Sequence, residues 1–360
     1  MAERILIEMH AHTKESSSCG WLAAADLIDA LAERKYGAVV ITDHYIPGQR
    51  QNPEDRQAFL AGFHHAKEAG DARSIVALPG IEIRFQDKKE DYLVYGMEEE
   101  DILGLPDDVC AWGIRKFHSF ANDKGWMVYQ AHPFRSKMLP ADPSEIDGME
   151  TFNGNPRHNN QNRLSSSFAM RHSLRTIAGS DIHRPGDVGI VGLLAPGEAL
   201  SPKGMAAWLQ RTPSPRVQYQ EAPVDGILYL TDAVPNRNML EALYQDAGWT
   251  RYLDAMDKTM AGIRNSLRVV TAWDDTMLVG MGRAVGDGNT ILYIQDLLVL
   301  GTFQRRGIGR ALMQRLIRPY LSVRQVVVLT DDVVETKKFY RACGFERISD
   351  IHCVGYIRLR

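Results

Sequence analysis

The sequence of 360 residues is poor in cysteine and contains no long apolar run. Its four cysteines, Cys19, Cys110, Cys343 and Cys353, include no CxxC pair, which excludes a close-set disulfide framework and favours a reducing compartment. No segment approaches the roughly 20 apolar residues of a membrane span, and the start lacks the apolar core of a signal peptide. We therefore expect a cytoplasmic protein without a membrane partner.

A strong excess of charge is also absent. The formal net charge of −3 argues against a nucleic-acid surface as the main partner, and no basic stripe is evident. Hydrophobic residues make up 44% and charged residues 24%, as in ordinary globular proteins. Because 360 residues exceed the usual size of one domain, we expect two domains.

The first 195 residues alternate short apolar runs with stretches of helical periodicity. The predicted strands lie in "RILIEMH", "AVVITDH", "SIVALPGIEIRF", "DYLVYG", "WMVYQAHP", "GMETFNG" and "RTIAGSDIH". Helical patterns lie between several of them, for example "LAAADLIDALAERKYG", which ends at a glycine suited to a helix C-terminus. Repeated strand-then-helix units imply parallel strands, and therefore an α/β fold that is either a barrel or a doubly wound sheet.

The pattern changes after residues 210–226. This stretch, "QRTPSPRVQYQEAPVDG", holds three prolines and shows no periodicity, which is typical of a linker. Beyond it, "SLRVVTAW", "TMLVGMGRAV" and "TILYIQDLLVL" predict consecutive antiparallel strands, followed by helices at about 307–320 and 333–343. We expect two dissimilar domains, 1–215 and 216–360.

Imidazole and carboxylate side chains stand at the ends of successive predicted strands. His10 and His12 are two residues apart on a strand, so they point to the same face. The other members of this set are His44, Glu82, Asp91, His132, Asp181 and His183. Because the C-terminal ends of parallel barrel strands share one rim, these side chains can converge. Imidazole plus carboxylate is a ligand mixture for Zn²⁺, Mn²⁺ or Fe, and a bridging carboxylate suits a multinuclear hydrolytic site.

Each of these residues alone has an ordinary structural explanation, such as a turn, a helix cap or a surface charge. Eight of them at the ends of successive strands are hard to obtain by chance, so we favour a metal centre. The histidines that fall in predicted helices or loops are interpreted as surface or packed side chains. They are His64, His65, His118, His158 and His172.

The motifs "HAH", "ITDH", "GIE", "AHPFR" and "GSDIH", in this order and spacing, resemble the PHP (polymerase and histidinol phosphatase) family over roughly residues 1–200. The resemblance implies a distorted (β/α)7 barrel that binds two or three Mn, Fe or Zn ions and hydrolyses phosphate esters. It implies a first metal held by His10, His12, Glu82 and Asp181. It implies a second held by Glu82, Asp91 and His132, and a third held by His44 and His183.

The resemblance also implies how the site handles phosphate. Metals would bind phosphate oxygens and lower the pKa of an attacking water. Arg135 and Arg184 each follow a ligand motif closely and are candidates for bidentate phosphate contacts, although Arg135 also fits an ordinary surface role. Asn153 in "TFNGN" resembles a family position near the site.

The third metal position departs from the family pattern. Family members with three metals usually supply a His or Asp five or six residues after HxH, where this chain has Ser17 and Ser18. Cys19 is an alternative soft ligand for zinc, but its position does not match the family's. We therefore expect two tightly held ions, and a third only at high metal concentration or with phosphate bound.

A second motif lies near residue 304. The strand "YIQDLLV" is followed by "QRRGIGRAL", in which glycines and arginines open an amphipathic helix. Exposed backbone N–H groups, the helix dipole and the arginines favour a diphosphate there. A tight turn with solvated arginines is the alternative, and the spacing is not that of a dinucleotide-binding fingerprint.

Together with "VVVLTDD" and "TKKFYRACGF", this motif resembles the GNAT N-acetyltransferases over about residues 226–360. The resemblance implies acetyl-CoA in a cleft between two splayed strands. It implies cofactor contacts from Leu298, Val299, Gln304, Arg305, Arg306, Gly307, Ile308, Gly309 and Arg310. Tyr340 occupies the position that often serves as the acid. Asp296 is a candidate base, directly or through water, or else a carboxylate that stabilises a β-bulge.

These observations predict a bifunctional enzyme that hydrolyses a small phosphoester and acetylates a small amine. Two alternatives remain. In one, an acetyltransferase carries a degenerate PHP module that only binds a ligand. In the other, a phosphoesterase carries a GNAT module that senses CoA.

Overall fold

The computed structural model describes residues 4–48, 52–158, 160–221, 224–352 and 354–356. It divides the chain into two compact units, Met1–Leu228 and Tyr229–Arg360. In the described part of the chain, no helix is both long enough and apolar enough to cross a membrane.

The strands of the first unit form two sheets. One sheet has the order β11-β10-β1-β2-β4, with β1 at Arg4–Ala11, β2 at Ala38–Ile41, β4 at Val76–Pro79, β10 at Val191–Pro196 and β11 at Arg216–Tyr219. The other has the order β3-β5-β6-β7-β8-β9. Its strands are β3 (His44–Tyr45), β5 (Ile81–Arg84), β6 (Asp91–Tyr95), β7 (Met127–Gln130), β8 (Gly148–Asn153) and β9 (Arg175–Gly179).

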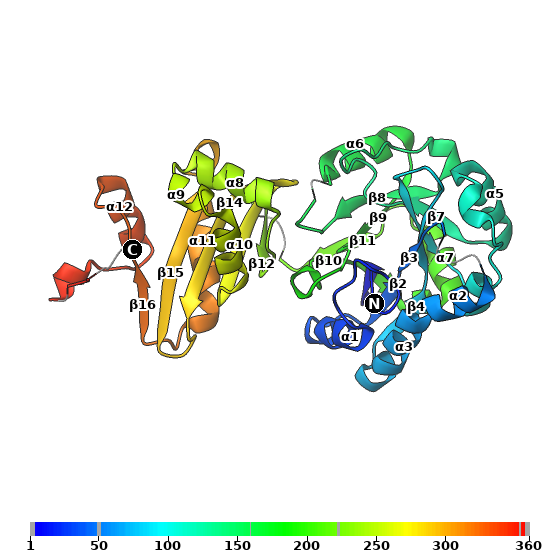
Figure 1. Cartoon of the computed structure of the whole chain (residues 1–360), viewed down its shortest axis with the longest axis horizontal. Helices are drawn as coiled ribbons and strands as arrows, with labels where there is room; N and C mark the ends of the chain where they lie inside the picture. Colours follow the sequence, from blue (N-terminus) through cyan, green and yellow to red (C-terminus); the bar gives the residue numbers. More distant parts are fainter. Residues whose placement is uncertain (1–3, 49–51, 159, 222–223, 353, 357–360) are drawn as a thin grey trace. The chain divides into compact units, whose positions relative to one another are not determined.

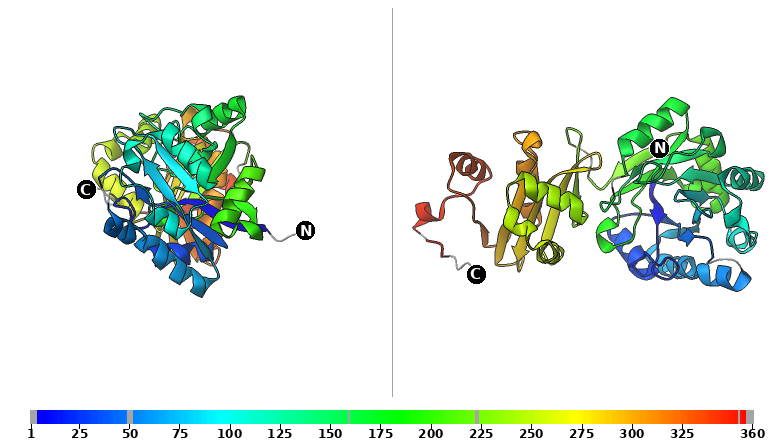
Figure 2. Two further views of the ribbon diagram at one scale, coloured as in Figure 1. Left: turned by 90° about the vertical axis from the view of Figure 1, so that its right-hand side faces the viewer. Right: turned by 45° about the horizontal axis from the view of Figure 1, so that its top comes forward.

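The helices of this unit lie outside the strands (Figures 1 and 2). They are α1 (Ala24–Glu33), α2 (Pro53–Phe59), α3 (Ala61–Arg73), α4 (Glu99–Leu103), α5 (Ile114–Lys124), α6 (Asn162–His172) and α7 (Pro202–Arg211). Helix α1 buries Ala24, Leu27, Ile28 and Leu31, the spacing of one helical face. Helix α2 begins where the Asn52 side chain accepts a hydrogen bond from the Asp55 backbone N–H.

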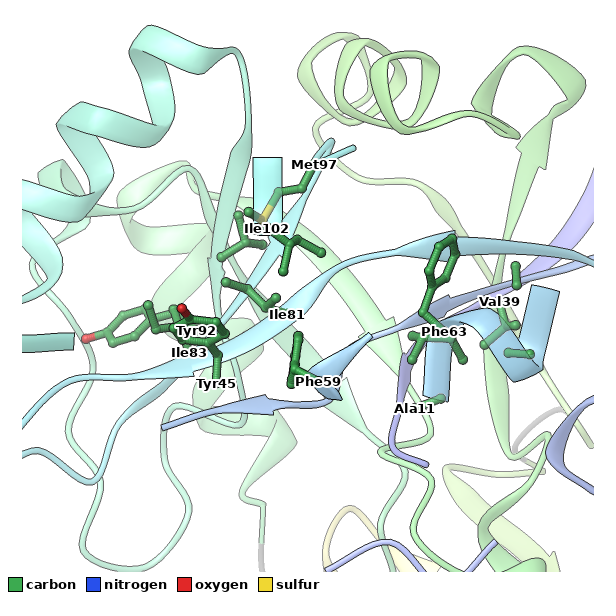
Figure 3. Packing of buried hydrophobic residues seen from close by; sticks show 14 of the residues in the cluster. Ala11, Val39, Tyr45, Phe59, Phe63, Ile81, Ile83, Tyr92, Met97 and Ile102 are labelled. Carbon is green, nitrogen blue, oxygen red and sulfur yellow. The ribbon is translucent and has the colours of Figure 1, made fainter. Parts of the chain in front are cut away.

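Apolar side chains from these strands and helices form a shared core. Figure 3 shows Tyr45 of β3, Phe59 of α2 and Ile83 of β5 among its members, together with Tyr92 of β6. All four are nearly inaccessible to solvent, and burying a side chain of this size stabilises the fold by about 1.5–3 kcal/mol. This core supports the strand ends that carry the candidate ligands.

The fold class is mixed α/β, but the predicted (β/α)7 barrel is not confirmed. Among the described residues the strands form two sheets, and β6 runs antiparallel to both β5 and β7. The strands β1, β2 and β4 pair in parallel, as do β7, β8 and β9. The end of β1 meets the segment after β9, because His12 N–H donates to the Ile182 carbonyl at 3.0 Å and Ile182 N–H to the His10 carbonyl at 3.1 Å.

The second unit is built on the sheet β12-β13-β14-β15-β16. Its strands are β12 (Ile227–Thr231), β13 (Arg268–Asp274), β14 (Met277–Gly286), β15 (Ile291–Val299) and β16 (Gln325–Val328). The prediction of three consecutive antiparallel strands is confirmed for β13 to β15, and β16 pairs with β15 in parallel. The helices are α8 (Arg237–Asp246), α9 (Thr250–Leu253), α10 (Met256–Arg264), α11 (Ile308–Ile317) and α12 (Val334–Ala342).

The segment expected to be a linker is partly ordered. Residues 210–211 end α7, and β11 pairs antiparallel with β10 of the first unit. The structure therefore divides the chain after Leu228, whereas the sequence places the division after residue 215. A four-residue strand is too short to show a periodic pattern, which is why the sequence did not reveal it.

We predict that residues 1–220 and 221–360, expressed separately, each fold and remain soluble. A cut after residue 220 leaves β11 with its partner β10 and keeps β12 with the second sheet. Circular dichroism and a cooperative thermal transition of each fragment test this. If neither fragment is soluble, the two units instead share a large obligatory apolar interface.

Candidate functional site

The predicted metal ligands of the first unit converge. His10 lies in β1, His44 begins β3, Glu82 lies in β5 and Asp91 begins β6. The segments after β1, β7 and β9 carry His12, His132, and Asp181 with His183. The structure gathers all eight into overlapping groups whose ligand atoms lie within 4.8 Å of one another.

The tightest group consists of His10, His12, Glu82 and Asp181. The Nε2 atoms of the two histidines are 3.1 Å apart. Each lies 3.5 Å from Asp181 Oδ1, and they lie 3.5 and 3.3 Å from the two Glu82 oxygens. A tetrahedral site with ligand bonds of about 2.0–2.1 Å has ligand–ligand edges of about 3.3 Å. The distances from the two imidazoles to each other and to both carboxylates are therefore close to the edges of a metal tetrahedron.

Some buried polar atoms of this group make no hydrogen bond in the described part of the chain. Among the described residues, Asp181 Oδ1 and His12 Nδ1 are buried without a hydrogen-bond partner, and Glu82 Oε2 lies 3.0 Å from His44 Nδ1. Leaving buried carboxylate oxygens unsatisfied is costly, and native structures contain few such groups. A cation between the four side chains would satisfy Asp181 Oδ1, so the residues fit a divalent metal.

The electrostatics of the cluster also favour a cation-binding centre. Burial would raise the pKa of Glu82, but His44 and His10 hold it well below its usual value. Burial would likewise lower the pKa of His10, yet the carboxylates of Asp181, Glu150 and Glu82 raise it well above its usual value. The Glu82 carboxylate therefore stays ionised, and the buried His10 imidazole holds its extra proton because the carboxylates around it are negatively charged.

The second predicted group is looser. His132 Nε2 lies 3.1 Å from Glu82 Oε1, and Asp91 groups with His44 and Glu82. The carboxylate of Asp91 also accepts two hydrogen bonds of 2.7 Å from the Arg84 guanidinium. This bidentate pair was not predicted, and it leaves Asp91 fewer lone pairs for a metal than Glu82 has.

The third group differs from the sequence expectation. Ser17 turns away, since its hydroxyl donates to Asp43 Oδ1 at 2.6 Å and accepts from the His44 N–H. Instead Cys19 lies with His12, His44 and His183, although its sequence position does not match the family's. Burial alone would raise the pKa of Cys19, but hydrogen bonds with His183 and His44 lower it to about 7.

Glu150 is a buried carboxylate that the sequence analysis missed. Its oxygens lie 3.0 Å from His10 Nδ1, 3.0 Å from the His132 N–H and 2.8 Å from Asn153 Nδ2. A carboxylate on the far nitrogen of a metal-ligating histidine fixes its tautomer, so with a metal bound Glu150 would hold the proton on Nδ1 and leave Nε2 for the ion. Gly179 permits this packing, because a Cβ there would lie 2.5 Å from the His10 Cβ.

We predict that Glu150→Ala lowers metal affinity about 10–100-fold, since partners that orient ligating histidines typically have effects of that size. Glu150→Gln keeps an acceptor for His10 Nδ1 and should have the smaller effect. Isothermal titration with Mn²⁺ measures both. Glu198→Gln, at a carboxylate that is 62% exposed, serves as the matched control. Equal affinity in all three variants would contradict this positioning role.

The two predicted phosphate-binding arginines occupy different surroundings. The Arg135 guanidinium contacts Asp181 Oδ2 at 2.6 Å, Asn160 Oδ1 at 2.9 Å and Asn153 Oδ1 at 3.3 Å. It therefore borders the metal cluster. The Arg184 guanidinium instead lies 4.4 Å from the centre of the Trp21 ring, which is 65% exposed. Asn153 lies in the same network as Arg135.

The second unit contains a cavity of about 690 Å³ between β15, β16, the start of α11 and α12. Seven of the nine predicted cofactor contacts line it: Leu298, Val299, Gln304, Arg305, Gly307, Gly309 and Arg310. Arg306 and Ile308 do not. The Arg306 guanidinium lies over the Phe303 ring at 4.8 Å, and Ile308 faces the core. Gly307 precedes the helix with φ 82°, a conformation that favours glycine.

Residues 234–359 match a family model described as "Acetyltransferase (GNAT) domain". The chain is also similar to a GNAT-family acetyltransferase from Streptococcus pneumoniae TIGR4, with 32% identity and a TM-score of 0.35. That match covers 37% of this chain and 98% of the other. The chain belongs to the GNAT acetyltransferases.

A second family match lies in the first unit. Residues 159–197 match a model described as "PHP-associated". The chain is thus a fusion of a PHP-type region with a GNAT domain. A two-domain protein from Bacteroides vulgatus ATCC 8482, described as containing a predicted PHP-like metal-dependent phosphoesterase, is 15% identical with a TM-score of 0.44. The match covers 61% of this chain and 65% of the other.

A curated relative of the GNAT domain is histone acetyltransferase TAP1 of Glycine max. It is 32% identical over 120 residues, which are 30% of this chain and 50% of that protein. GCN5-related N-acetyltransferase 3 of Arabidopsis thaliana is 39% identical over 69 residues, which are 19% of this chain and 29% of that protein. This chain therefore spans half or less of the length of these relatives.

Within the GNAT domain, the two predicted catalytic residues differ in placement. Tyr340 lines the cavity, and burial raises the pKa of its hydroxyl, so it is protonated at neutral pH. Asp296 is not among the residues that line the described cavity. It is 1% exposed, pairs with Arg283 directly across from it on β14, and accepts from the Tyr244 hydroxyl at 2.9 Å. Both contacts are to Oδ2, while Oδ1 has no hydrogen-bond partner among the described residues; because Asp296 does not line the cavity, the geometry favours a structural role over direct proton abstraction.

Proposed function

We propose that the chain is a bifunctional enzyme, in which the first unit hydrolyses a phosphate ester with divalent metals and the GNAT domain acetylates a small amine. The convergence of His10 and His12 with the carboxylates of Glu82 and Asp181, with Asp181 Oδ1 left without a hydrogen-bond partner among the described residues, carries the hydrolase part. The helix-start cavity and the family match support the transferase part. The hydrogen bonds between β1 and the segment after β9 support a distorted (β/α)7 arrangement of the first unit.

In the hydrolase site, His10, His12, Glu82 and Asp181 would hold one ion, and Glu82 would bridge to a second held by His132 and Asp91. Bound divalent ions supply Lewis acidity and a water of lowered pKa. Glu150 keeps the proton of His10 on Nδ1, so that Nε2 presents a lone pair. Arg135 borders the cluster and is placed to pair with phosphate oxygens and to offset the charge that develops on them.

In the transferase site, backbone N–H groups at the start of α11, with Arg305 and Arg310, would hold the diphosphate of acetyl-CoA. Leu298 and Val299 of β15 line the same cavity and would contact the arm of the cofactor. Tyr340 lines this cavity and would donate its proton to the sulfur that leaves when the amine nitrogen forms its bond to the acetyl carbon. The proton lost by the amine would pass to water, since Asp296 does not line the described cavity and its Oδ2 pairs with Arg283 and Tyr244.

A screen of phosphomonoesters and phosphodiesters with Mn²⁺, paired with acetyl-CoA turnover against a panel of amines, tests both halves. Hydrolysis and thiol release from one preparation would support the bifunctional proposal. Metal binding without hydrolysis would favour a first unit that only binds its ligand. Acetyl-CoA binding without turnover on any amine would favour a regulatory CoA sensor.

A further inference from the structure

The third ligand group differs chemically from the other two. It combines the thiol of Cys19 with the imidazoles of His12, His44 and His183, whose ligand atoms lie within 4.8 Å of one another. The His12 ring centre lies 4.5 Å from that of His44 and 4.4 Å from that of His183. The remaining groups each contain at least one carboxylate, from Glu82, Asp91 or Asp181.

A short closed loop holds Cys19 in this group. The Ser17 N–H donates to the Thr13 carbonyl at 3.0 Å, and the Lys14 N–H donates to the Leu22 carbonyl at 2.8 Å. Beyond Cys19, the Trp21 N–H donates to the His183 carbonyl at 2.8 Å. The thiol is thus fixed between two backbone attachments, one of which is the backbone of His183 itself.

A second observation points to a ligand at the same place. His12 Nε2 faces the first group, and its other ring nitrogen, Nδ1, is buried without a hydrogen-bond partner in the described part of the chain. His44 Nδ1 lies 3.0 Å from Glu82 Oε2, so this ring also borders the carboxylate of the neighbouring groups. A buried ring nitrogen is normally satisfied, so the unpartnered Nδ1 of His12, in a group that also holds a thiol and two further imidazoles, indicates a missing cation.

We propose that Cys19 makes this third group a zinc-selective site, and that the centre holds different metals at different positions. Thiolate and imidazole select zinc, whereas carboxylates suit manganese equally well. On binding, the Cys19 sulfur releases its proton to solvent and forms the bond to the ion, so its charge offsets that of the ion. The proposal rests on the proposed metal centre. The sequence predicted a weakly held third ion whatever the metal. We now expect weak binding at this position for manganese and tight binding for zinc.

Cobalt(II) provides a test that does not depend on activity. The full chain is stripped of metal, loaded with Co²⁺ and examined for the sulfur-to-cobalt charge-transfer band in the near ultraviolet. We expect the band in the wild type and in Cys110→Ser, whose thiol lies outside the groups. We expect its loss in Cys19→Ser. A wild type without the band, or a Cys19→Ser variant that keeps it, would overturn the proposal.

Elemental analysis after dialysis provides the second arm. Zinc-loaded wild type should retain one ion more per chain than zinc-loaded Cys19→Ser, while the two proteins loaded with manganese should retain equal amounts. Equal zinc contents would contradict the proposal. A separate measurement of hydrolysis distinguishes the proposed hydrolase function from the proposed zinc site. Manganese-dependent hydrolysis without a thiolate band leaves the proposed function standing, and a thiolate band without hydrolysis leaves only the zinc site.

Discussion

Asp181→Asn should slow phosphoester hydrolysis about a thousandfold, because losing about 4 kcal/mol of metal-dependent stabilisation has that effect on rate. Acetyl transfer should be unchanged. Asp181 Oδ1 lies 3.5 Å from both His10 Nε2 and His12 Nε2, and the neutral amide is a far weaker ligand than the carboxylate. Asp181 has φ 54°, a conformation that asparagine tolerates as well as aspartate, so the fold should survive.

Hydrolysis with Mn²⁺ and acetyl-CoA turnover are measured on the same preparation. His132→Ala should lose hydrolysis as well, since His132 Nε2 lies 3.1 Å from Glu82 Oε1. Asp29→Asn, at a side chain that is 53% exposed and belongs to none of the ligand groups, should behave as the wild type. Full hydrolysis by either the Asp181 or the His132 variant would refute their assignment as ligands.

Gly309→Glu should weaken acetyl-CoA binding about a hundredfold. The new side chain brings a negative charge to a helix start that should hold a diphosphate, where the macrodipole effect reaches about 2 kcal/mol. It also adds bulk, because a Cβ at this position would lie 3.3 Å from the Phe339 ring. Each 1.4 kcal/mol corresponds to tenfold in affinity, so the two effects together reach this size.

Gly309→Gln separates the two causes, since it adds similar bulk without charge. Calorimetry should place its affinity between those of Gly309→Glu and the wild type, and added salt should narrow the gap between the two variants. Hydrolysis by the first unit should be normal in both. If Gly309→Glu binds acetyl-CoA as tightly as the wild type, the cofactor does not lie at the start of α11.

The strand-end positions of the metal ligands could be predicted because a ligand at the end of a strand interrupts an apolar run. Glu150 escaped prediction, since it lies within β8 and nothing in "GMETFNG" shows which carboxylate turns inward. Cys19 depends on how the loop from Thr13 to Leu22 closes against His183, which spacing alone does not specify. The structure was therefore needed to identify the residue that orients a metal ligand, Glu150, and to bring Cys19 next to His183.

The same distinction holds in the GNAT domain and in the sheets. The glycine-rich helix start could be predicted because the residues proposed to bind the cofactor are consecutive in the sequence. The role of Asp296 was not, because its partner Arg283 lies on the neighbouring strand and becomes apparent only from the register of β14 and β15. The antiparallel direction of β6 and the short strand β11 likewise depend on pairing with distant segments.

The most direct test of the central claim is the hydrolysis of p-nitrophenyl phosphate by metal-stripped protein titrated with Mn²⁺. Our account predicts no turnover without metal, saturable turnover as Mn²⁺ is added, and a flat response from Asp181→Asn over the same range. Tight Mn²⁺ binding in the wild type, with no hydrolysis of this or any other phosphoester at any metal concentration, would contradict it.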